Sequence, residues 1–339
     1  MTKQTFKFTN SATDFYFSAN INQLREIVEL KSTIFITDEN VYAAQKGKFS
    51  NFKTIVIKAG EQYKTQATVT SIIQQLIEHE ADRQTILIGV GGGVITDITG
   101  YVASIYMRGI AFGFVPTTLL ALVDASIGGK NGIDVGVYKN IVGVTKQPAF
   151  ILHDLNFLKT LPDNQWRNGF AEIIKHACIK DQAMLKELQQ YSIDDYKTTR
   201  KLIDTLVQRN VKLKLKVVQS DEFEKDERRL LNFGHTLGHA LENQYKLMHG
   251  EAVAIGMAYA AKLSEKITGF KNTDTLLETL EMYGLPAQIK FNKAKVFEVL
   301  KMDKKRERKD INYILLEKMG KGIVHLLSLR EIEEFIQSL

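Results

Sequence analysis

Cysteine is nearly missing from this chain of 339 residues, in which Cys178 is the only one. A single thiol cannot close an internal disulfide, so the sequence gives no sign of an oxidising compartment. An apolar signal core is also missing from the first ten residues, MTKQTFKFTN. The most apolar stretch, residues 101–124, contains Arg108 and Pro116 and is typical of a protein core rather than of a membrane span. We therefore expect a cytoplasmic protein.

Proline is scarce, with 4 residues against 23 glycines, which predicts long regular elements joined by tight turns. The net charge is only +6, because 39 acidic residues are dispersed among 45 basic ones. No basic stripe carries interleaved aromatic residues, so we expect no nucleic-acid partner. A mild positive excess fits an anionic small-molecule substrate equally well. The densest basic run, typical of a solvated surface, consists of Lys304, Lys305, Arg306, Arg308 and Lys309.

The first half of the sequence predicts a parallel α/β domain. Short β-branched or wholly apolar runs, such as TILIGV at residues 85–90, alternate with helical patterns, such as the one over residues 66–80. Strands without polar alternation are typical of a parallel sheet that helices cover on both faces. The expected strands are residues 33–37, 54–58, 85–90, 110–115 and 150–153.

Helical periodicity dominates the second half, from about Leu161 onward, with a small hairpin expected near the end. A chain of this length fits two domains. We therefore predict a Rossmann-like α/β domain over residues 1–153 and a mostly α-helical domain over residues 154–339. The expected helices are residues 163–180, 183–192, 196–220, 226–247, 249–268, 273–284 and 292–302, and the expected hairpin strands are residues 311–316 and 322–327.

The stretch VGGGVITDITG, residues 90–100, joins a predicted strand to a predicted helix. Three glycines allow a tight turn and a close backbone approach to a pyrophosphate, which the N-terminus of the following helix also favours. The pattern differs from G-x-G-x-x-G and is also typical of a strand-to-helix turn without any ligand. Asp97 falls in the first helical turn, where its simplest role is a favourable interaction with the helix dipole.

A second stretch, PTTLLALVDASIGGKNGID at residues 116–134, continues to Lys139 and Asn140. Asp124 and Lys130 lie on either side of its Gly-Gly turn. Lysine offers a point charge and asparagine offers directional donors, so the loop suits phosphate or carboxylate binding. A surface hairpin with solvated lysines is the alternative.

A third stretch, GFAEIIKHACIKD at residues 169–181, places Glu172, Lys175 and His176 on one helix face. An ordinary helix ion pair would explain Glu172 and Lys175. The surrounding residues are apolar, however, and a carboxylate buried among them would require a partner.

The fourth stretch is LLNFGHTLGHALENQYKLMHGEAVAIGM, residues 230–257, and it holds three of the seven histidines. His235 and His239 are four residues apart and project to one side of a helix, and His249 begins the next helix. Two histidines with a carboxylate such as Glu172 would make a zinc site that keeps a position open for substrate. Spacing alone does not decide which two histidines bind, and the HxxxH pair is the simplest choice.

These four stretches, in this order, resemble the 3-dehydroquinate synthase family, one of the sugar-phosphate cyclases. The resemblance covers the chain from Asp38 to about Gly322. Thr96 stands where the family usually has glycine, and His176 and Ala177 replace a more usual Tyr-Gly pair. These differences concern local packing, because none of them removes a functional group.

The resemblance implies NAD in the first domain and a divalent metal, Zn²⁺ or Co²⁺, in the second. It implies Glu172, His235 and His249 as metal ligands, and it moves His239 to the substrate side, against the HxxxH choice. The NAD-binding positions that it implies are Asp38, Asn40, Glu61, Lys64, Gly92, Gly93, Asp97, Thr117, Thr118, Lys130, Lys139 and Thr160.

The implied reaction converts 3-deoxy-D-arabino-heptulosonate 7-phosphate into 3-dehydroquinate and phosphate. It combines transient oxidation by NAD, phosphate elimination, re-reduction and an aldol ring closure. Arg228 would bind the carboxylate, while Arg108 and Lys304 would bind the phosphate. The positions implied for substrate binding and catalysis are Arg108, Asp124, Lys130, Lys139, Asn140, Lys175, Lys214, Arg228, Asn232, His239 and Lys304.

Three alternatives share parts of this site. Another sugar-phosphate cyclase would use the same cofactors on a substrate without a carboxylate. A polyol dehydrogenase would produce NADH steadily, and a non-catalytic regulator would bind the dinucleotide without turnover. Lys130, Asn140 and Arg228 favour the substrate with a carboxylate. The residue matching Arg108 reaches the neighbouring subunit's site in related enzymes, so the resemblance also implies a homodimer. Since residues 101–124 are expected to be core, we expect no membrane partner.

Overall fold

The computed structural model describes residues 1–136, 138–301, 306–307 and 310–338. The chain separates into two compact units, each described here by itself. Unit 1 comprises Met1–Gln165 and Ile203–Glu222, and unit 2 comprises Trp166–Leu202 and Phe223–Leu339. Much of one long helix, α7 (Arg200–Ser220), therefore clusters with the N-terminal unit. The division at residue 153 into cofactor-binding and metal-binding domains stays a prediction.

Unit 1 is built on a seven-stranded sheet in the order β1-β2-β9-β6-β5-β3-β4. All neighbouring pairs are parallel except β1 with β2. This arrangement confirms the predicted α/β class and adds an N-terminal hairpin that the sequence analysis did not anticipate. The strands are β1 (Thr2–Lys7), β2 (Ala12–Phe17), β3 (Thr33–Asp38), β4 (Lys53–Ile57), β5 (Ile86–Gly91), β6 (Ala111–Pro116) and β9 (Phe150–Leu152).

The central strands are buried on both faces, as their uninterrupted apolar runs predict. Phe35, Ile88, Val90, Val115 and Leu152 come from four of these strands and share one hydrophobic cluster. The other elements of unit 1 are the helices α1 (Glu39–Ala44), α2 (Gln66–Glu78) and α3 (Gly93–Ile105), the short turns η5 (Tyr106–Arg108), η6 (Ala121–Ala125) and η7 (Leu155–Thr160), and the hairpin strands β7 (Lys130–Val135) and β8 (Tyr138–Thr145).

The strand register places three chemically important turns at one edge of the sheet. Val90 of β5 pairs with Thr37 of β3 on one side and with Val115 of β6 on the other. These parallel strands end one residue later, at Asp38, Gly91 and Pro116. The carboxyl edge of an open parallel sheet is where such folds bind their ligands.

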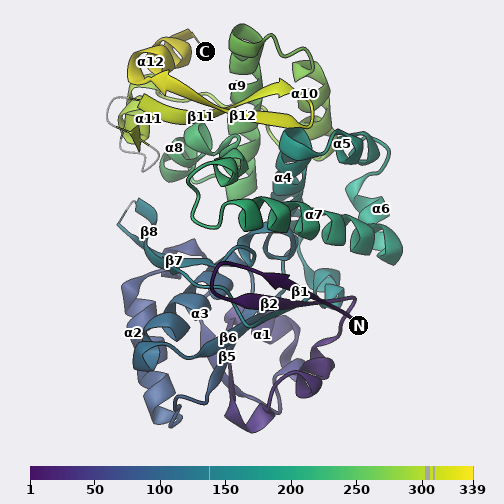
Figure 1. Cartoon of the computed structure of the whole chain (residues 1–339), viewed down its shortest axis with the longest axis vertical. Coiled ribbons are helices and arrows are strands. Elements are labelled where there is room, and N and C mark those ends of the chain that lie inside the picture. Colours follow the sequence, from purple (N-terminus) through teal and green to yellow (C-terminus); the bar gives the residue numbers. More distant parts are fainter. Residues whose placement is uncertain (137, 302–305, 308–309, 339) are drawn as a thin grey trace. The chain divides into compact units, whose positions relative to one another are not determined.

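Unit 2 is mostly helical and carries one small antiparallel sheet, β10-β11-β12. Strand β11 packs against α9, and the hairpin of β11 with β12 confirms the one expected near the end (Figure 1). In the part of the chain that the structure describes, no helix is both long and apolar enough to cross a membrane. The elements are α4 (Asp163–Lys180), α5 (Gln182–Leu188), α6 (Ile193–Thr198), η8 (Glu227–Asn232), α8 (His235–Tyr245), α9 (His249–Thr268), α10 (Thr273–Met282), α11 (Lys293–Lys301), β10 (Arg306–Glu307), β11 (Asp310–Lys318), β12 (Lys321–Ser328) and α12 (Leu329–Ser338).

Two of the predicted helices are wrong as continuous elements. The helix expected over residues 196–220 is interrupted at Thr199, whose ψ of 92° is extended and separates α6 from α7. The helix expected over residues 226–247 is interrupted at Gly234, which has a left-handed φ of 79° and separates η8 from α8. Periodicity failed here because the apolar spacing continues across both breaks, while a single backbone angle ends each helix.

Glycines allow α8 and α9 to approach very closely. A Cβ added at Gly256 would lie 1.8 Å from the carbonyl oxygen of Gly234, and one added at Gly238 would lie 2.8 Å from that of Ala252. No real side chain tolerates such distances, so only glycine fits at these two positions. The contact sets the spacing between a helix that carries His235 and a helix that begins with His249.

We expect Gly256→Ala to destabilise the protein by at least about 2 kcal/mol, since overpacking typically costs ~1–3 kcal/mol and the obstructing atoms here are backbone. Denaturant unfolding of the purified variant measures this loss. Gly47→Ala is the control, because a Cβ added at Gly47 meets nothing within 4 Å. Equal unfolding midpoints for the Gly256→Ala variant and the unsubstituted protein would contradict the expectation.

Candidate metal centre and dinucleotide site

The carboxylate of Glu172 lies at the centre of a polar cluster in unit 2. Glu172 belongs to α4, and its side chain has no exposed surface. Its Oε1 lies 2.9 Å from Nε2 of His249 and 3.4 Å from Nε2 of His235. Its Oε2 contacts the ammonium group of Lys175, one turn further along α4. A fully buried carboxylate is tolerated only with such partners.

The histidines that surround this carboxylate come from two helices. His235 and His239 lie on the same face of α8, and their ring centroids are 5.1 Å apart. His249 is the first residue of α9, and its ring centroid lies 5.3 Å from that of His235 and 6.2 Å from that of His239. The three rings therefore form one group, although only two of them share a helix.

The second ring nitrogen of each histidine beside Glu172 has its own acceptor. Nδ1 of His235 lies 3.2 Å from the backbone oxygen of Phe233, and Nδ1 of His249 lies 3.5 Å from Oε2 of Glu242. A neutral imidazole with its proton on Nδ1 has a lone pair on Nε2, the nitrogen that faces Glu172 in both histidines. The start of α9 is anchored as well, because the Gly250 amide donates to the side chain of Asn168 on α4.

The cluster perturbs the pKa of each member differently. Burial opposes ionisation of Glu172, but Lys175 and His235 outweigh it and hold the pKa of the carboxyl well below its usual range. Burial, together with Lys175, lowers the pKa of His235 to about 4. Hydrogen bonds with Glu172 and Glu242 outweigh burial at His249 and raise its pKa to about 10. In the metal-free cluster, His235 is therefore neutral near pH 7, while His249 is charged.

This donor set fits a divalent metal ion. Ligand atoms of Glu172, His235 and His249 lie within 4.8 Å of one another. One buried carboxylate and two imidazoles form the ligand set of a catalytic zinc site, and the carboxylate needs the positive charge that a metal supplies. A neighbouring set of His239, Glu242 and His249 meets the same distance limit. Among the described residues, no such group contains His235 together with His239, so the geometry does not favour the HxxxH pair.

The predicted dinucleotide residues of unit 1 gather along the carboxyl edge of its sheet. Asp38 ends β3 and accepts hydrogen bonds from the backbone amides of Asn40 and Val41. Gly92 precedes α3, and a Cβ added there would meet the Thr118 methyl group at 3.1 Å. The Thr117 amide donates to the Gly91 carbonyl at 2.9 Å and holds the turns after β5 and β6 together. Gly93 begins this helix, and a helix N-terminus that follows a glycine turn suits a pyrophosphate.

Lys64 organises a second polar cluster in unit 1. Its buried ammonium lies 2.5 Å from Asp97, 2.5 Å from the side-chain oxygen of Asn140 and 3.9 Å from Glu61. Burial opposes the charge of Lys64, but Asp97 and Glu61 outweigh it and raise the pKa of the ammonium. Lys139 lies 3.7 Å from Glu61. Five predicted site residues from three separate segments therefore lie together.

Lys214 and Asp124 form another pair within unit 1. The Lys214 ammonium lies 2.7 Å from Oδ1 of Asp124 and donates to its backbone oxygen, also at 2.7 Å. This contact draws α7 to the short helix η6. Thr160 accepts a hydrogen bond from Gln45, whereas Lys130 and Arg108 are exposed.

The remaining predicted residues belong to unit 2 or lie outside the described part. Arg228 is 2% exposed and belongs to η8, where a buried guanidinium requires anionic or carbonyl partners. Asn232 ends the same turn and donates to Glu224 at 2.6 Å. Lys304, expected at the phosphate, lies outside the described residues.

Three carboxylates of these clusters were missed by the sequence analysis: Glu242, Glu224 and Asp134. Glu242 follows His235 by seven residues on α8 and so shares its face, a helical spacing that was visible in the sequence. Glu224 has a left-handed φ of 59° and is joined to Asn232 by a turn that periodicity does not predict. Asp134 accepts from the Asn140 amide across the β7–β8 hairpin, at 2.7 Å.

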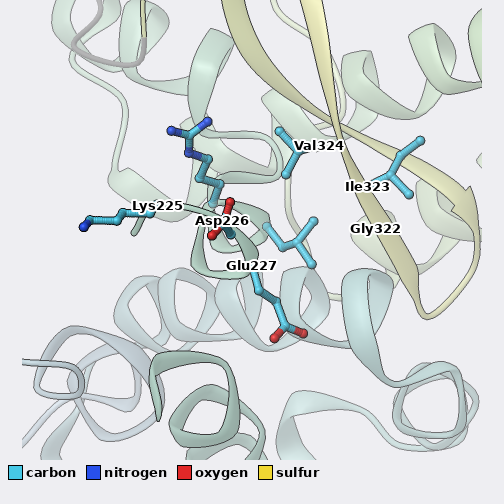
Figure 2. A pocket seen from close by; sticks show the side chains of 8 residues that line it. Lys225, Asp226, Glu227, Gly322, Ile323 and Val324 are labelled. Carbon is cyan, nitrogen blue, oxygen red and sulfur yellow. The ribbon is translucent and has the colours of Figure 1, made fainter. Parts of the chain in front are cut away.

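Unit 2 also contains a pocket of about 320 Å³ between η8 and β12 (Figure 2). Charged residues from the start of η8 form one side, and Ile323 and Val324 of β12 form the other. None of the residues that line it belongs to the predicted site.

Known proteins are similar to this chain over most of its length. Residues 54–168 match the family described as 3-dehydroquinate synthase N-terminal, and residues 169–306 match 3-dehydroquinate synthase C-terminal. A 3-dehydroquinate synthase of Methylacidiphilum infernorum is 44% identical over 79% of this chain and 75% of its own length. One of Campylobacter jejuni subsp. doylei is 37% identical over 91% of this chain and 92% of its own.

Solved structures of sugar-phosphate cyclases are similar over nearly the whole chain. A 2-deoxy-scyllo-inosose synthase with carbaglucose-6-phosphate, NAD⁺ and Co²⁺ has a TM-score of 0.87 and 26% identity, covering 99% of this chain and 100% of that one. A 2-epi-5-epi-valiolone synthase from Streptomyces hygroscopicus with NAD⁺ and Zn²⁺ has a TM-score of 0.85 and 26% identity, with 98% of each chain covered. The function expected from the sequence, that of a lyase, is confirmed, and the chain belongs to the 3-dehydroquinate synthase family.

Proposed function

We propose that this chain uses NAD and a divalent metal, Zn²⁺ or Co²⁺, to convert 3-deoxy-D-arabino-heptulosonate 7-phosphate into 3-dehydroquinate and phosphate. The observation that carries the proposal is the meeting of Glu172, His235 and His249 around one buried carboxylate oxygen. Relatives with solved structures hold NAD⁺ and Co²⁺ or Zn²⁺. The proposed enzyme is a cytoplasmic homodimer.

In this proposal, Glu172, His235 and His249 hold the metal. When bound, the metal would acidify a sugar hydroxyl, and NAD would take up and later return a hydride. Lys175 already neutralises Glu172. A divalent cation bound to Glu172 would take over the neutralisation of this carboxylate. The Lys175 ammonium would then be available to the anionic substrate. His239 lies beside both histidine ligands and would move protons on the substrate side.

The NAD-binding role is proposed for the carboxyl edge of the sheet in unit 1. The amides at the start of α3 would bind the pyrophosphate, helped by the small size of Gly92 and Gly93, which lets the backbone approach it closely. Asp38 lies at the end of β3, where an acidic residue suits a ribose hydroxyl. The other positions proposed for the dinucleotide are Asn40, Glu61, Lys64, Asp97, Thr117, Thr118, Lys130, Lys139 and Thr160.

Two anionic groups on the substrate explain the number of cations in the proposed site. Arg228 presents a planar fork that suits the carboxylate, and Arg108 and Lys304 are assigned to the phosphate. Asn232 would assist at the phosphate. The remaining substrate positions, in the clusters of unit 1 and beside the metal, are Asp124, Lys130, Lys139, Asn140, Lys175 and Lys214.

Purified protein supplied with NAD and Zn²⁺ should release inorganic phosphate from the heptulosonate phosphate, and a strong chelator should abolish the release because the metal acidifies the reacting hydroxyl. A colorimetric phosphate assay measures both effects. Restoring Zn²⁺ after chelation is the control. Metal-loaded protein that releases no phosphate would refute the proposed function.

The same assay separates the rival activities. Glucose 6-phosphate and sedoheptulose 7-phosphate lack the carboxylate, and phosphate release from either one alone would identify another sugar-phosphate cyclase. A polyol dehydrogenase would give a steady rise in NADH absorbance, which a cyclase that returns its hydride does not. A regulator would bind NAD in a calorimetric titration without any turnover.

His235→Ala should lose the metal, whereas His239→Ala should keep it and lose roughly 10²–10⁴-fold in kcat, the usual contribution of a general acid or base. Metal content by atomic emission and the rate of phosphate release measure the two effects separately. Both histidines lie on one face of α8, so each variant serves as the control for the other. The reverse pattern would refute the ligand assignment.

Gly92→Val should weaken NAD binding by at least about tenfold, because its side chain fills the surface that the dinucleotide approaches. Calorimetric titration with NAD measures the affinity. Gly47→Val, at a glycine with open space around it, is the control. Zn²⁺ affinity should stay unchanged, since the proposed ligands belong to unit 2. Unchanged NAD affinity in the Gly92→Val variant would argue against the glycine turn as the NAD site.

A further inference from the structure

Glu242 is a buried carboxylate to which neither the family comparison nor the proposed reaction gives a role. It lies on α8, seven residues after His235 and three after His239, and therefore on the same helix face. The side chain is only 6% exposed. A carboxylate at such a depth costs several kcal/mol of desolvation unless polar partners compensate it. Its position thus requires an explanation beyond surface solubility.

The imidazole of His249 lies between two carboxylates. Its Nε2 is 2.9 Å from Oε1 of Glu172, and its Nδ1 is 3.5 Å from Oε2 of Glu242. The second contact is at the long end for a hydrogen bond, but an ionised acceptor strengthens it. Both carboxylates come from other helices, Glu172 from α4 and Glu242 from α8, whereas His249 begins α9.

An imidazole that binds a metal through Nε2 carries its proton on Nδ1 and needs an acceptor there. His235 has such an acceptor in the backbone oxygen of Phe233. His249 has Glu242 in the equivalent position, with a full negative charge instead of a carbonyl dipole. A charged acceptor both fixes the ring orientation and makes the nitrogen that faces the metal more basic.

We propose that Glu242 is a positioning residue of the metal centre, which holds His249 through Nδ1 and directs its Nε2 to the metal beside Glu172 and His235. This inference rests on the proposed metal site but assigns a residue outside its ligand set. Glu242 tightens the metal by orienting and polarising His249, without itself binding the ion.

The alternative is that Glu242 is a ligand. Together with His239 and His249 it satisfies the same distance limit as the proposed set. In that arrangement His249 would bind the metal through Nδ1, and its Nε2 would only contact Glu172. The burial of Glu172 argues against Glu242 as the ligand. Glu172 has no exposed surface, whereas Glu242 is 6% exposed, so Glu172 has the greater need of a compensating cation.

The test compares Zn²⁺ affinity in the full-length protein by competition with a chromogenic chelator. Glu242→Ala should weaken Zn²⁺ by about 10–100-fold, the usual effect of removing an outer partner of a ligating histidine. Glu242→Gln keeps an oxygen acceptor without the charge and should lose less. Glu278→Ala is the matched control, since Glu278 is an exposed carboxylate of α10 in the same unit.

Substitution with Co²⁺ supplies an independent readout. The visible absorption bands of the Co²⁺-saturated Glu242→Ala variant should match those of the unsubstituted protein, because the three ligands remain. Altered band positions or intensities that report a lost ligand would overturn the positioning role. Equal Zn²⁺ affinities of the unsubstituted protein and both Glu242 variants would overturn it as well.

Folding and activity are controlled separately. Metal-free Glu242→Gln, which is nearly isosteric, should melt within a few degrees of the metal-free unsubstituted protein, so a loss of affinity in this variant is not a loss of fold. The affinity comparison does not require turnover. Absence of phosphate release from metal-loaded, unsubstituted protein therefore refutes the proposed function, whereas equal affinities refute the role of Glu242.

Discussion

The buried charge of Glu172 is the constraint around which unit 2 is organised. A carboxylate with no exposed surface is unstable in a protein unless cations and donors surround it. Lys175 supplies a cation from the same helix, and His249 supplies another from the start of α9, while the ring of His235 on α8 lies 3.4 Å from the same carboxylate. The three helices must therefore meet at one point, and the glycines of α8 and α9 make this approach possible. The packing of α4, α8 and α9 and the geometry of the proposed metal site therefore depend on the same approach of the helices.

The histidines respond to this charge in opposite ways. His235 is buried beside Lys175 and is held neutral, whereas His249 lies between two carboxylates and is held charged. Only a neutral imidazole binds a metal, so loading the site must release a proton from His249. Metal affinity should consequently depend on pH, and the identity of the groups around His249 controls that dependence.

In unit 1 the constraint is close access of an anionic dinucleotide to the backbone at the carboxyl edge of the sheet. The parallel register brings the ends of β3, β5 and β6 to one edge, and the glycines after β5 allow the close contacts with Thr118 and Ala125 there. Lys64 is fully paired with Asp97 and Asn140, so it stiffens the neighbouring loops as well as carrying charge. The dense ion pairs of this cluster explain how a loop rich in polar residues keeps a defined shape.

The sequence by itself determined the residue chemistry and much of the fold. Apolar runs predicted the central strands, because burial on both faces leaves no polar alternation, and the order of the four motifs identified the family. Local patterns did not determine the breaks at Thr199 and Gly234, since one backbone angle ends a helix while the apolar period continues. Helical spacing also favoured His235 with His239. The family resemblance joined His249 with Glu172 and His235 instead. Local patterns could not show Glu242 beside His249, because the approach of α4, α8 and α9 depends on contacts between residues that are far apart in the chain.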